Sequence, residues 1–517
     1  MIRGASEPPR ALLGAAATSA LIALVPLAYL VIRVLEAGPA RITEALLRER
    51  TLQTIITSLA LVGIVVIACL AVGLPVAWLL ARTQVPWRRT WLVLAALPLA
   101  IPSYVAAYAW LAQFPGMQGI WSAALVLSLV SLPYVVLPVT AALGSIDPAL
   151  EEVARSLGRG PVRAFVQGTL PQAWPAVAAG SLLVALYVLS DFGAVALLRV
   201  DAFSRVIYAT YRASFDRTGA AVLAMVLVVL AALLVVAERR VRGRASRYRV
   251  SSGVARSPGR VPLAAPTQFA ALALLVVVAS AAVGFPIASL LARMAEGTRS
   301  PLDVAELLVA LAGSAGVSLL GALIALALAL PVAALAARYR SARVSTIETM
   351  SYAGHALPGV VVGLALVFLT LGVLPIAYQT LATLAFAYAV LFLPKAIGAS
   401  RSAIAGVPPV IEQTARTLGR SPLRAWTATT ARIAWTGIAA GGLLVLLTAM
   451  KELPATLMLR PTGLDTLATE LWSRTEVAAY GAAAPYALAL IALAAVPAWL
   501  LSAAMNKGPR AVDMVAS

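Results

Sequence analysis

Long apolar runs recur along the whole chain and constrain its fold more than any other feature. About 20 apolar residues are enough for a helix to cross a bilayer. Because lipid offers no hydrogen-bonding partner to an open backbone, and the alternating pattern of barrel strands is absent, such runs predict helices. The sequence, 61% hydrophobic, therefore predicts an all-α integral membrane protein with about twelve transmembrane helices. The predicted spans are residues 11–34, 54–81, 90–112, 118–142, 173–197, 219–237, 268–291, 312–336, 354–373, 378–399, 434–457 and 483–503.

The distribution of charge predicts how the chain crosses the membrane. The formal net charge is +19. If the N-terminus is cytoplasmic, essentially all of this excess lies in the inner segments, whereas the outer segments are balanced. This is the positive-inside pattern, so we expect both termini in the cytoplasm. The excess then reflects topology in a lipid bilayer, and we expect no nucleic-acid partner.

The chain repeats itself. Residues 148–165 and 409–426 are identical at ten of 18 positions, and residues 57–82 match residues 313–338. Each half holds six spans, an even number, so both copies have the same orientation and form two parallel repeats. The expected division is a tail, first span and outer loop (1–50), a first lobe (51–237), an Arg-rich cytoplasmic linker (238–266), the seventh span and outer loop (267–306), a second lobe (307–505) and a cytoplasmic tail (506–517).

The segment that is repeated with the highest identity is polar and lies between two predicted spans. In each copy, helix-forming residues lead to Gly158 or Gly419, which suits a left-handed helix end. Pro161 or Pro422 then suits the first turn of a second helix. The pattern predicts a cytoplasmic helix–turn–helix within loops 143–172 and 400–433. It fits either an amphipathic elbow on the membrane face or a docking surface; two matched copies favour docking to a twofold partner.

These residues resemble the EAA loop of permease subunits in binding-protein-dependent ABC importers. The first copy reads Glu152-Val-Ala154-Arg-Ser-Leu-Gly158, followed by Leu170-Pro171. The second has Gln413 in place of the motif glutamate, with Glu412 one residue away, and lacks the Leu-Pro pair. The resemblance covers the chain from about residue 51 and implies a type I importer permease fold in a bacterial inner membrane.

The resemblance also implies partners. The two loops would be coupling helices seated on two copies of an ABC ATPase subunit, and an extracytoplasmic solute-binding protein would deliver the substrate. No cofactor is expected on this chain; ATP and Mg would bind the ATPase partner. The residues assigned to ATPase coupling are Glu151, Glu152, Ala154, Gly158, Arg159, Arg163, Glu412, Ala415, Gly419, Arg420 and Arg424.

The chain contains no ATPase motif of its own. Its three lysines are Lys395, Lys451 and Lys507, and none follows a glycine, as the lysine of a phosphate-binding Walker A loop must. The chain has a single histidine, which argues against a histidine-based catalytic triad. We therefore expect a transport subunit rather than an enzyme, with no catalytic residues.

Two further segments bear on the substrate. Residues 190–195 and 451–456 resemble corresponding parts of fused, two-lobed ferric-iron permeases. Thiamine, polyamine or phosphonate are alternative substrates, and an ion-gradient-driven secondary transporter is the alternative class. Ionisable groups at membrane depth usually line a pathway, although these residues also suit helix ends at the interface. We expect no tightly bound metal, only transient contact with Asp191 or Glu452. The pathway or gate candidates are Asp191, Phe192, Gly193, Lys451, Glu452 and Pro454.

Overall fold

The computed structural model describes residues 8–147, 149–213, 216–245, 259–296 and 303–506. Within these residues, nine helices are long and apolar enough to cross a membrane, and one bent helix pair makes a tenth. Two shorter apolar helices, Gly359–Val373 and Tyr480–Ala494, occupy the places of the predicted ninth and twelfth spans. An apolar helix or helix pair therefore stands at each of the twelve predicted spans. The prediction of an all-α membrane protein is confirmed.

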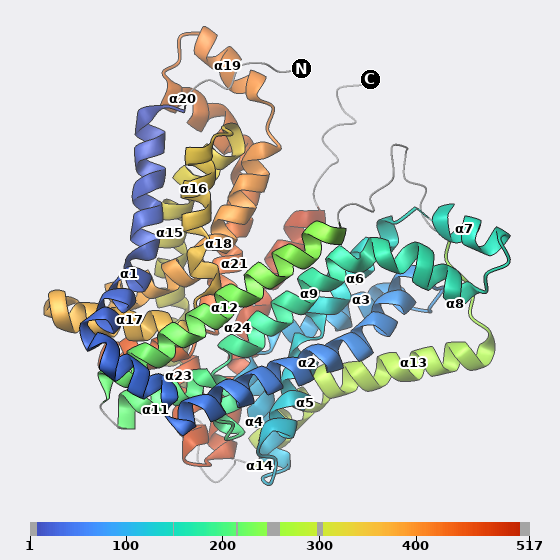
Figure 1. Cartoon of the computed structure of the whole chain (residues 1–517), viewed down its shortest axis with the longest axis horizontal. Helices are drawn as coiled ribbons and strands as arrows, with labels where there is room; N and C mark the ends of the chain where they lie inside the picture. The colour runs from blue at the N-terminus through green and yellow to red at the C-terminus, as the bar shows by residue number, and fades with distance from the viewer. Residues whose placement is uncertain (1–7, 148, 214–215, 246–258, 297–302, 507–517) are drawn as a thin grey trace. The chain divides into compact units, whose positions relative to one another are not determined.

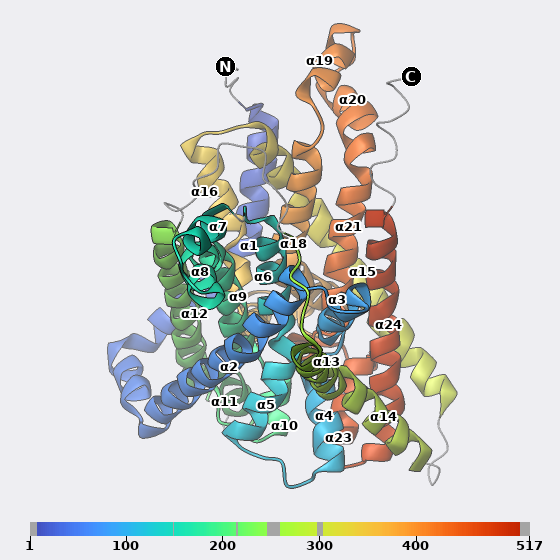
Figure 2. The same ribbon diagram turned by 90° about the vertical axis from the view of Figure 1, so that its right-hand side faces the viewer.

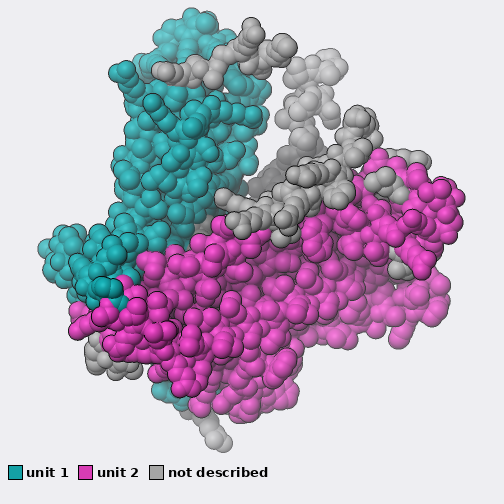
Figure 3. All heavy atoms as spheres, in the orientation of Figure 1, with its two compact units in different colours: residues 1–39, 300–517 teal, residues 40–299 magenta. Residues whose placement is uncertain are grey.

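The chain forms two compact units, coloured separately in Figure 3. One unit comprises Met1–Pro39 and Ser300–Ser517, and the other comprises Ala40–Arg299. The first boundary falls where α1 (Arg10–Leu47) is broken at Gly38, whose φ of 77° is open mainly to glycine. The first helix thus groups with the second half of the sequence, and the seventh span groups with the first half. The sequence-based division into consecutive lobes does not indicate this exchange.

In the unit formed by Ala40–Arg299, the described residues contain sixteen helical elements after α1. They are α2 (Glu49–Arg82), α3 (Arg88–Ala96), η1 (Leu97–Ala100), α4 (Ser103–Gln113), α5 (Ile120–Ser131), α6 (Pro133–Ser145), α7 (Ala149–Ser156), α8 (Pro161–Ala164), η2 (Phe165–Thr169), α9 (Leu170–Ser190), α10 (Gly193–Leu197), α11 (Phe203–Ala213), α12 (Arg217–Ala245), α13 (Ala265–Ala279), η4 (Ser280–Gly284) and α14 (Phe285–Glu296). Helix α12 extends into the predicted linker 238–266; residues 246–258 lie outside the described residues.

The other unit contains the first part of α1 and the elements from α15 onward. These are α15 (Val304–Arg338), α16 (Ala342–Ser351), η5 (Ala353–Ala356), α17 (Gly359–Val373), η6 (Pro375–Ala377), α18 (Leu381–Ala405), α19 (Pro409–Thr417), α20 (Pro422–Trp426), η7 (Thr427–Ala431), α21 (Arg432–Ala449), α22 (Pro454–Leu459), α23 (Leu467–Glu476) and α24 (Tyr480–Asn506). Most of the predicted C-terminal tail, residues 507–517, lies outside the described residues.

Each unit receives its exchanged helix through specific contacts. Small side chains of α1, such as Ala16 and Ala20, pack in one buried cluster with alanines of α15 and allow close helix approach. In the other unit, Ser289 of α14 donates a hydrogen bond of 2.7 Å to the Ala109 carbonyl of α4. The Trp110 and Phe285 rings lie 4.1 Å apart beside it. Both helices are therefore part of the apolar core of their unit.

The same three-helix arrangement forms the centre of both units. Helices α2, α6 and α9 pack together in one, and α15, α18 and α21 in the other. A glycine at an equivalent position permits a close approach in each case. A Cβ at Gly180 would lie 2.7 Å from the Tyr134 carbonyl oxygen, and one at the equivalent Gly441 would lie 3.0 Å from the Ala399 Cβ. Glycines at matching points of the repeat therefore allow close helix approach, to backbone at Gly180 and to an alanine side chain at Gly441.

The predicted spans 90–112, 173–197, 354–373 and 434–457 are interrupted rather than continuous, the third of them between η5 and α17. The predicted span 90–112 bends by 92° between η1 and α4, at Ile101-Pro102. The predicted spans 173–197 and 434–457 end at Ser190 and Ala449, before the short helices α10 and α22. Proline at 102 removes a backbone donor, and a carboxylate starts each short helix, as described below. The sequence predicts spans at these places without locating the interruptions within them.

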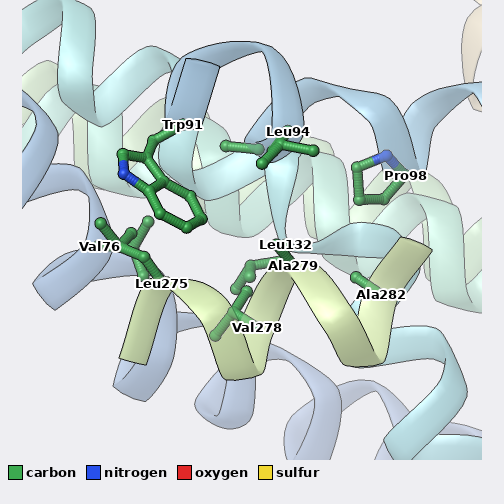
Figure 4. A pocket seen from close by; sticks show the side chains of 10 residues that line it. Val76, Trp91, Leu94, Pro98, Leu132, Leu275, Val278, Ala279 and Ala282 are labelled. Carbon is green, nitrogen blue, oxygen red and sulfur yellow. The ribbon is translucent and has the colours of Figure 1, made fainter. Parts of the chain in front are cut away.

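A small apolar cavity lies beside the bent pair, between α3 and α13 (Figure 4). Its volume is about 20 Å³, and Trp91, Pro98, Leu132 and Leu275 are among its lining residues. A space of this size could hold a single water only with polar partners, which this lining does not offer. The α3 arm of the bent pair is therefore packed less tightly here than the three-helix centre.

Candidate functional site

The first repeated loop forms the predicted helix–turn–helix. Gly158, two residues beyond the end of α7, has a left-handed φ of 78°. The Arg159 amide donates to the Ala154 carbonyl at 3.1 Å, and the Gly158 amide donates to the Arg155 carbonyl at 3.0 Å. These two bonds close the helix end in a Schellman-type turn. Helix α8 then begins at Pro161, and a π-helical turn, η2, connects it to α9.

The second loop has the same geometry. Gly419, two residues beyond the end of α19, has a φ of 84°, and the Arg420 amide donates to the Ala415 carbonyl at 3.2 Å. Helix α20 begins at Pro422, and the π-helical turn η7 precedes α21. Figures 1 and 2 show α19 and α20 beyond the ends of α18 and α21, and Figure 1 shows α7 and α8 at the corresponding end of α6 and α9. Both loops thus extend from the ends of spans as distinct elbows.

Glu151 faces inward and contacts three elements. Its carboxylate accepts hydrogen bonds of 2.7 Å from Arg155, one turn along α7, and 2.7 Å from the Thr169 hydroxyl of η2. Arg82, the last residue of α2, lies 3.9 Å away through Nη2. Arg82 is 6% exposed, and its Nε and Nη2 have no hydrogen-bond partner among the described residues. The glutamate therefore connects the loop to the ends of two spans.

Glu412 occupies the equivalent position in the second loop. It accepts hydrogen bonds of 2.5 Å from Arg416 and 3.0 Å from the Thr430 hydroxyl of η7. Arg338, the last residue of α15, donates to Thr430 at 3.5 Å and to the Val407 carbonyl at 2.8 Å. The sequence motif drew attention to Glu152 and its replacement by Gln413. The glutamate with matching contacts in both copies is instead Glu151 in the first loop and Glu412 in the second.

The opposite faces of the loops are exposed. Glu152, Gln413 and the assigned arginines Arg159, Arg163, Arg420 and Arg424 are all exposed, whereas Ala154 is half-buried and Ala415 buried. Leu157 and Leu418, which precede the turn glycines, are 74% and 78% exposed. Val153, one helical turn before Leu157, is exposed as well, and contiguous exposed apolar residues rimmed by polar ones mark interaction sites. Sequence reasoning missed these two leucines, although the Leu-Gly-Arg run is identical in both copies.

The pathway candidate Asp191 starts a helix. Its Oδ1 accepts hydrogen bonds from the amides of Ala194 and Val195, at 3.0 and 3.2 Å, in the first turn of α10. The hydroxyl of Ser103, the first residue of α4, also bonds to this carboxylate. A Cβ on Gly193 would lie 2.4 Å from the Tyr104 Cβ. Asp191 and Gly193 thus hold α10 against the start of α4. Phe192, which lies between them in the sequence, is buried.

Glu452 has the same role in the second lobe. Its two carboxylate oxygens accept hydrogen bonds of 3.0 Å from the amides of Ala455 and Thr456 in α22, which begins at Pro454. The Thr456 hydroxyl donates to the same carboxylate at 2.9 Å and lies 2.6 Å from the Tyr388 hydroxyl. A Cβ on Gly359, the first residue of α17, would lie 2.3 Å from Glu452 Oε1. Each acidic candidate is therefore a helix cap beside a second helix N-terminus.

The described residues contain no group of three His, Cys, Asp or Glu side chains placed to hold a metal ion. Asp191, Phe192 and Gly193 lie at the start of α10, and Glu452 and Pro454 lie at the start of α22. Lys451, just before Glu452, is half-buried. The two loops and the two caps form matched pairs in the repeat. They differ in surroundings, because the loops extend outward and the caps are buried.

The repeat and its loops have counterparts in known proteins. Residues 73–242 match the family described as binding-protein-dependent transport system inner membrane component. The Fe(3+)-transport system permease protein FbpB 2 of Haemophilus influenzae is 34% identical over 478 residues, which cover 92% of this chain and 94% of that protein. The sulfate transport system permease protein CysT of Escherichia coli is 27% identical over 248 residues, 44% of this chain and 89% of that protein.

A third relative, the molybdenum transport system permease protein ModB of Escherichia coli, is 31% identical over 159 residues, 28% of this chain and 69% of that protein. Relatives of this kind match less than half of this chain, whereas the match to FbpB 2 runs through both lobes. The apolar helices and the similarity over nearly the whole length lead to one assignment. The chain belongs to the family of binding-protein-dependent transport permeases, multi-pass inner-membrane proteins that form the transmembrane part of ABC importers.

Proposed function

We propose that this permease imports ferric iron. The observation that carries the proposal is the 34% identity to FbpB 2, which extends over 92% of this chain and therefore over both lobes. The matches to the sulfate and molybdenum permeases are shorter than half of the chain. Membership of a binding-protein-dependent family distinguishes the chain from carriers driven by an ion gradient. Ferric iron would reach it from an extracytoplasmic solute-binding protein.

The driving force would come from ATP hydrolysed by two copies of a separate ATPase subunit, which would also hold the Mg. The two exposed elbows support this arrangement, because α7–α8 and α19–α20 present the same fold from corresponding span ends. Each would seat its exposed leucine, Leu157 or Leu418, in an apolar depression of one subunit, with arginines around it. Glu152 and Gln413 are exposed at equivalent positions, and their difference in charge would make the two contacts unequal.

The charge distribution supports a cytoplasmic location for both elbows and both termini. The net charge of +19 lies almost wholly in the segments that this topology places inside. The caps at Asp191 and Glu452 would then lie toward the outer side, where α10 and α22 would contribute to an outer gate. Iron would make transient contact with their carboxylates only when the capping bonds open.

Transport by the purified complex tests the substrate. The permease would be reconstituted in vesicles with its ATPase subunit and its binding protein, and uptake of labelled ferric iron, thiamine, spermidine and phosphonate would be compared. We expect iron alone to accumulate in an ATP-dependent manner. Accumulation of thiamine, spermidine or phosphonate in place of iron would contradict the proposal.

A further inference from the structure

We propose that one partly buried Arg–Glu–Thr cluster in each lobe passes the movement of the coupling elbow to the membrane spans. The clusters are Arg82, Glu151 and Thr169 in the first lobe and Arg338, Glu412 and Thr430 in the second. The proposal rests on the proposed coupling function of the elbows. Its new element is the assignment of Arg82, Thr169, Arg338 and Thr430 as positioning residues of the transport cycle.

The first observation is how α7 is attached to its unit. Helix α7 packs mainly on α8 and on η2. Its connection to α2 is the ion pair of 3.9 Å between Arg82 and Glu151, and its connection to the start of α9 includes the 2.7 Å hydrogen bond from Thr169. One carboxylate thus joins the elbow to two spans that also pack against each other. A displacement of α7 reaches both spans through this carboxylate.

The second observation is that the cluster is assembled twice. The chain between the arginine and the glutamate is longer in the second lobe, and most of its residues differ. Even so, Arg338 ends α15 as Arg82 ends α2, and Thr430 stands in η7 as Thr169 stands in η2. Glu412 bonds to Thr430 at 3.0 Å, and Arg338 reaches the same hydroxyl at 3.5 Å. The two lobes have kept the same three side-chain types at the same junction.

The third observation concerns the free-energy cost of removing these polar side chains from water. Thr169 and Thr430 are 1% and 0% exposed, and Arg82 is 6% exposed with two nitrogens that lack hydrogen bonds among the described residues. In the first lobe, apolar side chains of similar size would hold such a junction at least as stably, because the Arg82–Glu151 ion pair gains little over its desolvation cost. A charged, directional contact instead fixes the orientation of α7 relative to the spans. Stability alone therefore does not account for the clusters.

The test compares Arg82→Gln and Thr169→Val, each with its second-lobe counterpart Arg338→Gln or Thr430→Val. Uptake and ATP hydrolysis are measured on the same vesicles containing permease, ATPase subunit and binding protein. We expect each double variant to assemble and hydrolyse ATP, while substrate transported per ATP falls about tenfold, as for loss of one buried charge-assisted hydrogen bond. Arg82→Lys, which keeps the charge, should restore part of the ratio.

The matched control is Arg155→Gln. It removes the other 2.7 Å partner of the same Glu151, but that partner is on α7 itself and is 47% exposed. Exposed pairs one helical turn apart contribute little, so transport per ATP should stay at the wild-type value. A wild-type ratio in the Arg82 and Thr169 variants would overturn the proposal. So would a parallel loss of assembly, ATP hydrolysis and uptake, because it indicates a structural role alone.

A second measurement replaces the contact between the carboxylate and the threonine hydroxyl by a covalent link. In a Cys69→Ser background, Glu151→Cys and Thr169→Cys are joined by a short thiol cross-linker. We expect the cross-linked permease to transport per ATP at least half as well as the wild type, because the elbow and α9 move as one body. Loss of uptake that returns on reversal of the cross-link would overturn the proposal. The ratio is measured with whichever substrate the wild type moves, so failure of the iron assignment would be recognised separately.

Discussion

Glu151 and Glu152 are neighbours in the sequence, yet their side chains have different surroundings. The Glu151 side chain is 14% exposed and bonds to a second helical element, whereas Glu152 is exposed. The difference follows from the helix period, because adjacent residues on a helix point about 100° apart. Comparison with the family motif selected Glu152. Comparison of the two lobes in three dimensions selected Glu151, because Glu412 repeats its contacts.

The acidic caps allow a test at the level of single residues. Glu452→Ala removes the acceptor for two amides of α22, so we expect a loss of about 1–2 kcal/mol in stability, the usual cost of deleting a helix cap. Glu452→Gln keeps an acceptor oxygen and should lose less. Thermal unfolding of the detergent-solubilised protein measures both.

Uptake by Asp191→Asn distinguishes a cap from a direct ligand. Asparagine caps helices about as well as aspartate, so this variant should retain most of the wild-type uptake rate in reconstituted vesicles. Asp191→Ala, which lacks the acceptor for the α10 amides, should retain less. Equal and complete loss in both variants would instead identify the negative charge as a contact of the cargo.

The helices themselves could be predicted from hydropathy, but their interruptions could not. A window long enough to detect a span averages over a break, so residues 173–197 gave one span although the helix ends at Ser190. Asp191 and Glu452 stood out as ionisable residues in apolar surroundings. Nothing in the sequence indicated that backbone amides would occupy their oxygens. The turns at Gly158 and Gly419, by contrast, followed directly from local Gly and Pro chemistry.

The elbow turn gives a prediction at the scale of one element. Gly158 has a left-handed backbone and no neighbour within 4 Å of an added Cβ, so only backbone strain opposes substitution. Gly158→Asn should be tolerated, because asparagine adopts this conformation readily, whereas Gly158→Val should cost about 1–2 kcal/mol and disorder the turn. Co-purification of the ATPase subunit should be retained in the first variant and reduced in the second. Equal recovery in both would show that the turn does not position the docking surface.

Helix packing gives a second prediction at this scale. Gly180→Ala places a Cβ 2.7 Å from the Tyr134 carbonyl oxygen and should destabilise the α6–α9 contact by about 1–3 kcal/mol through overpacking. Gly63→Ala is the control, because a Cβ there meets nothing within 4 Å and alanine favours the helix. Thermal unfolding should separate the two variants, with only Gly180→Ala less stable than the wild type. Equal stability would contradict the close approach.

At the scale of the whole molecule, the chain joins two similar lobes, and its similarity to FbpB 2 runs through both. The repeat and its parallel orientation could be predicted from sequence, because spans and matching segments are counted directly. The grouping of Met1–Pro39 with Ser300–Ser517 could not. The first and seventh spans are the least similar parts of the repeat, and the helix contacts that place them, such as Ser289 to Ala109, join residues far apart in the sequence.

Topology is the prediction at this scale. Cys69 is the sole cysteine, so a Cys69→Ser protein provides a background for single reporter cysteines. Leu157→Cys and Leu418→Cys should react with a membrane-impermeant maleimide in inside-out vesicles and not in intact spheroplasts. Opposite labelling of the two sites would contradict a parallel repeat. Labelling of both from outside would contradict the orientation derived from charge.

Reconstituted iron uptake with the first elbow intact or cut short tests the central claim most directly, which is that ATP drives this permease through its elbows. Vesicles contain the permease, ATPase subunit and binding protein. We predict that uptake requires ATP and the binding protein, persists when ion gradients are dissipated, and stops when residues 158–163 are deleted from a permease that still inserts. Uptake that continues without those residues, or that follows an ion gradient in the absence of ATP, would contradict the account.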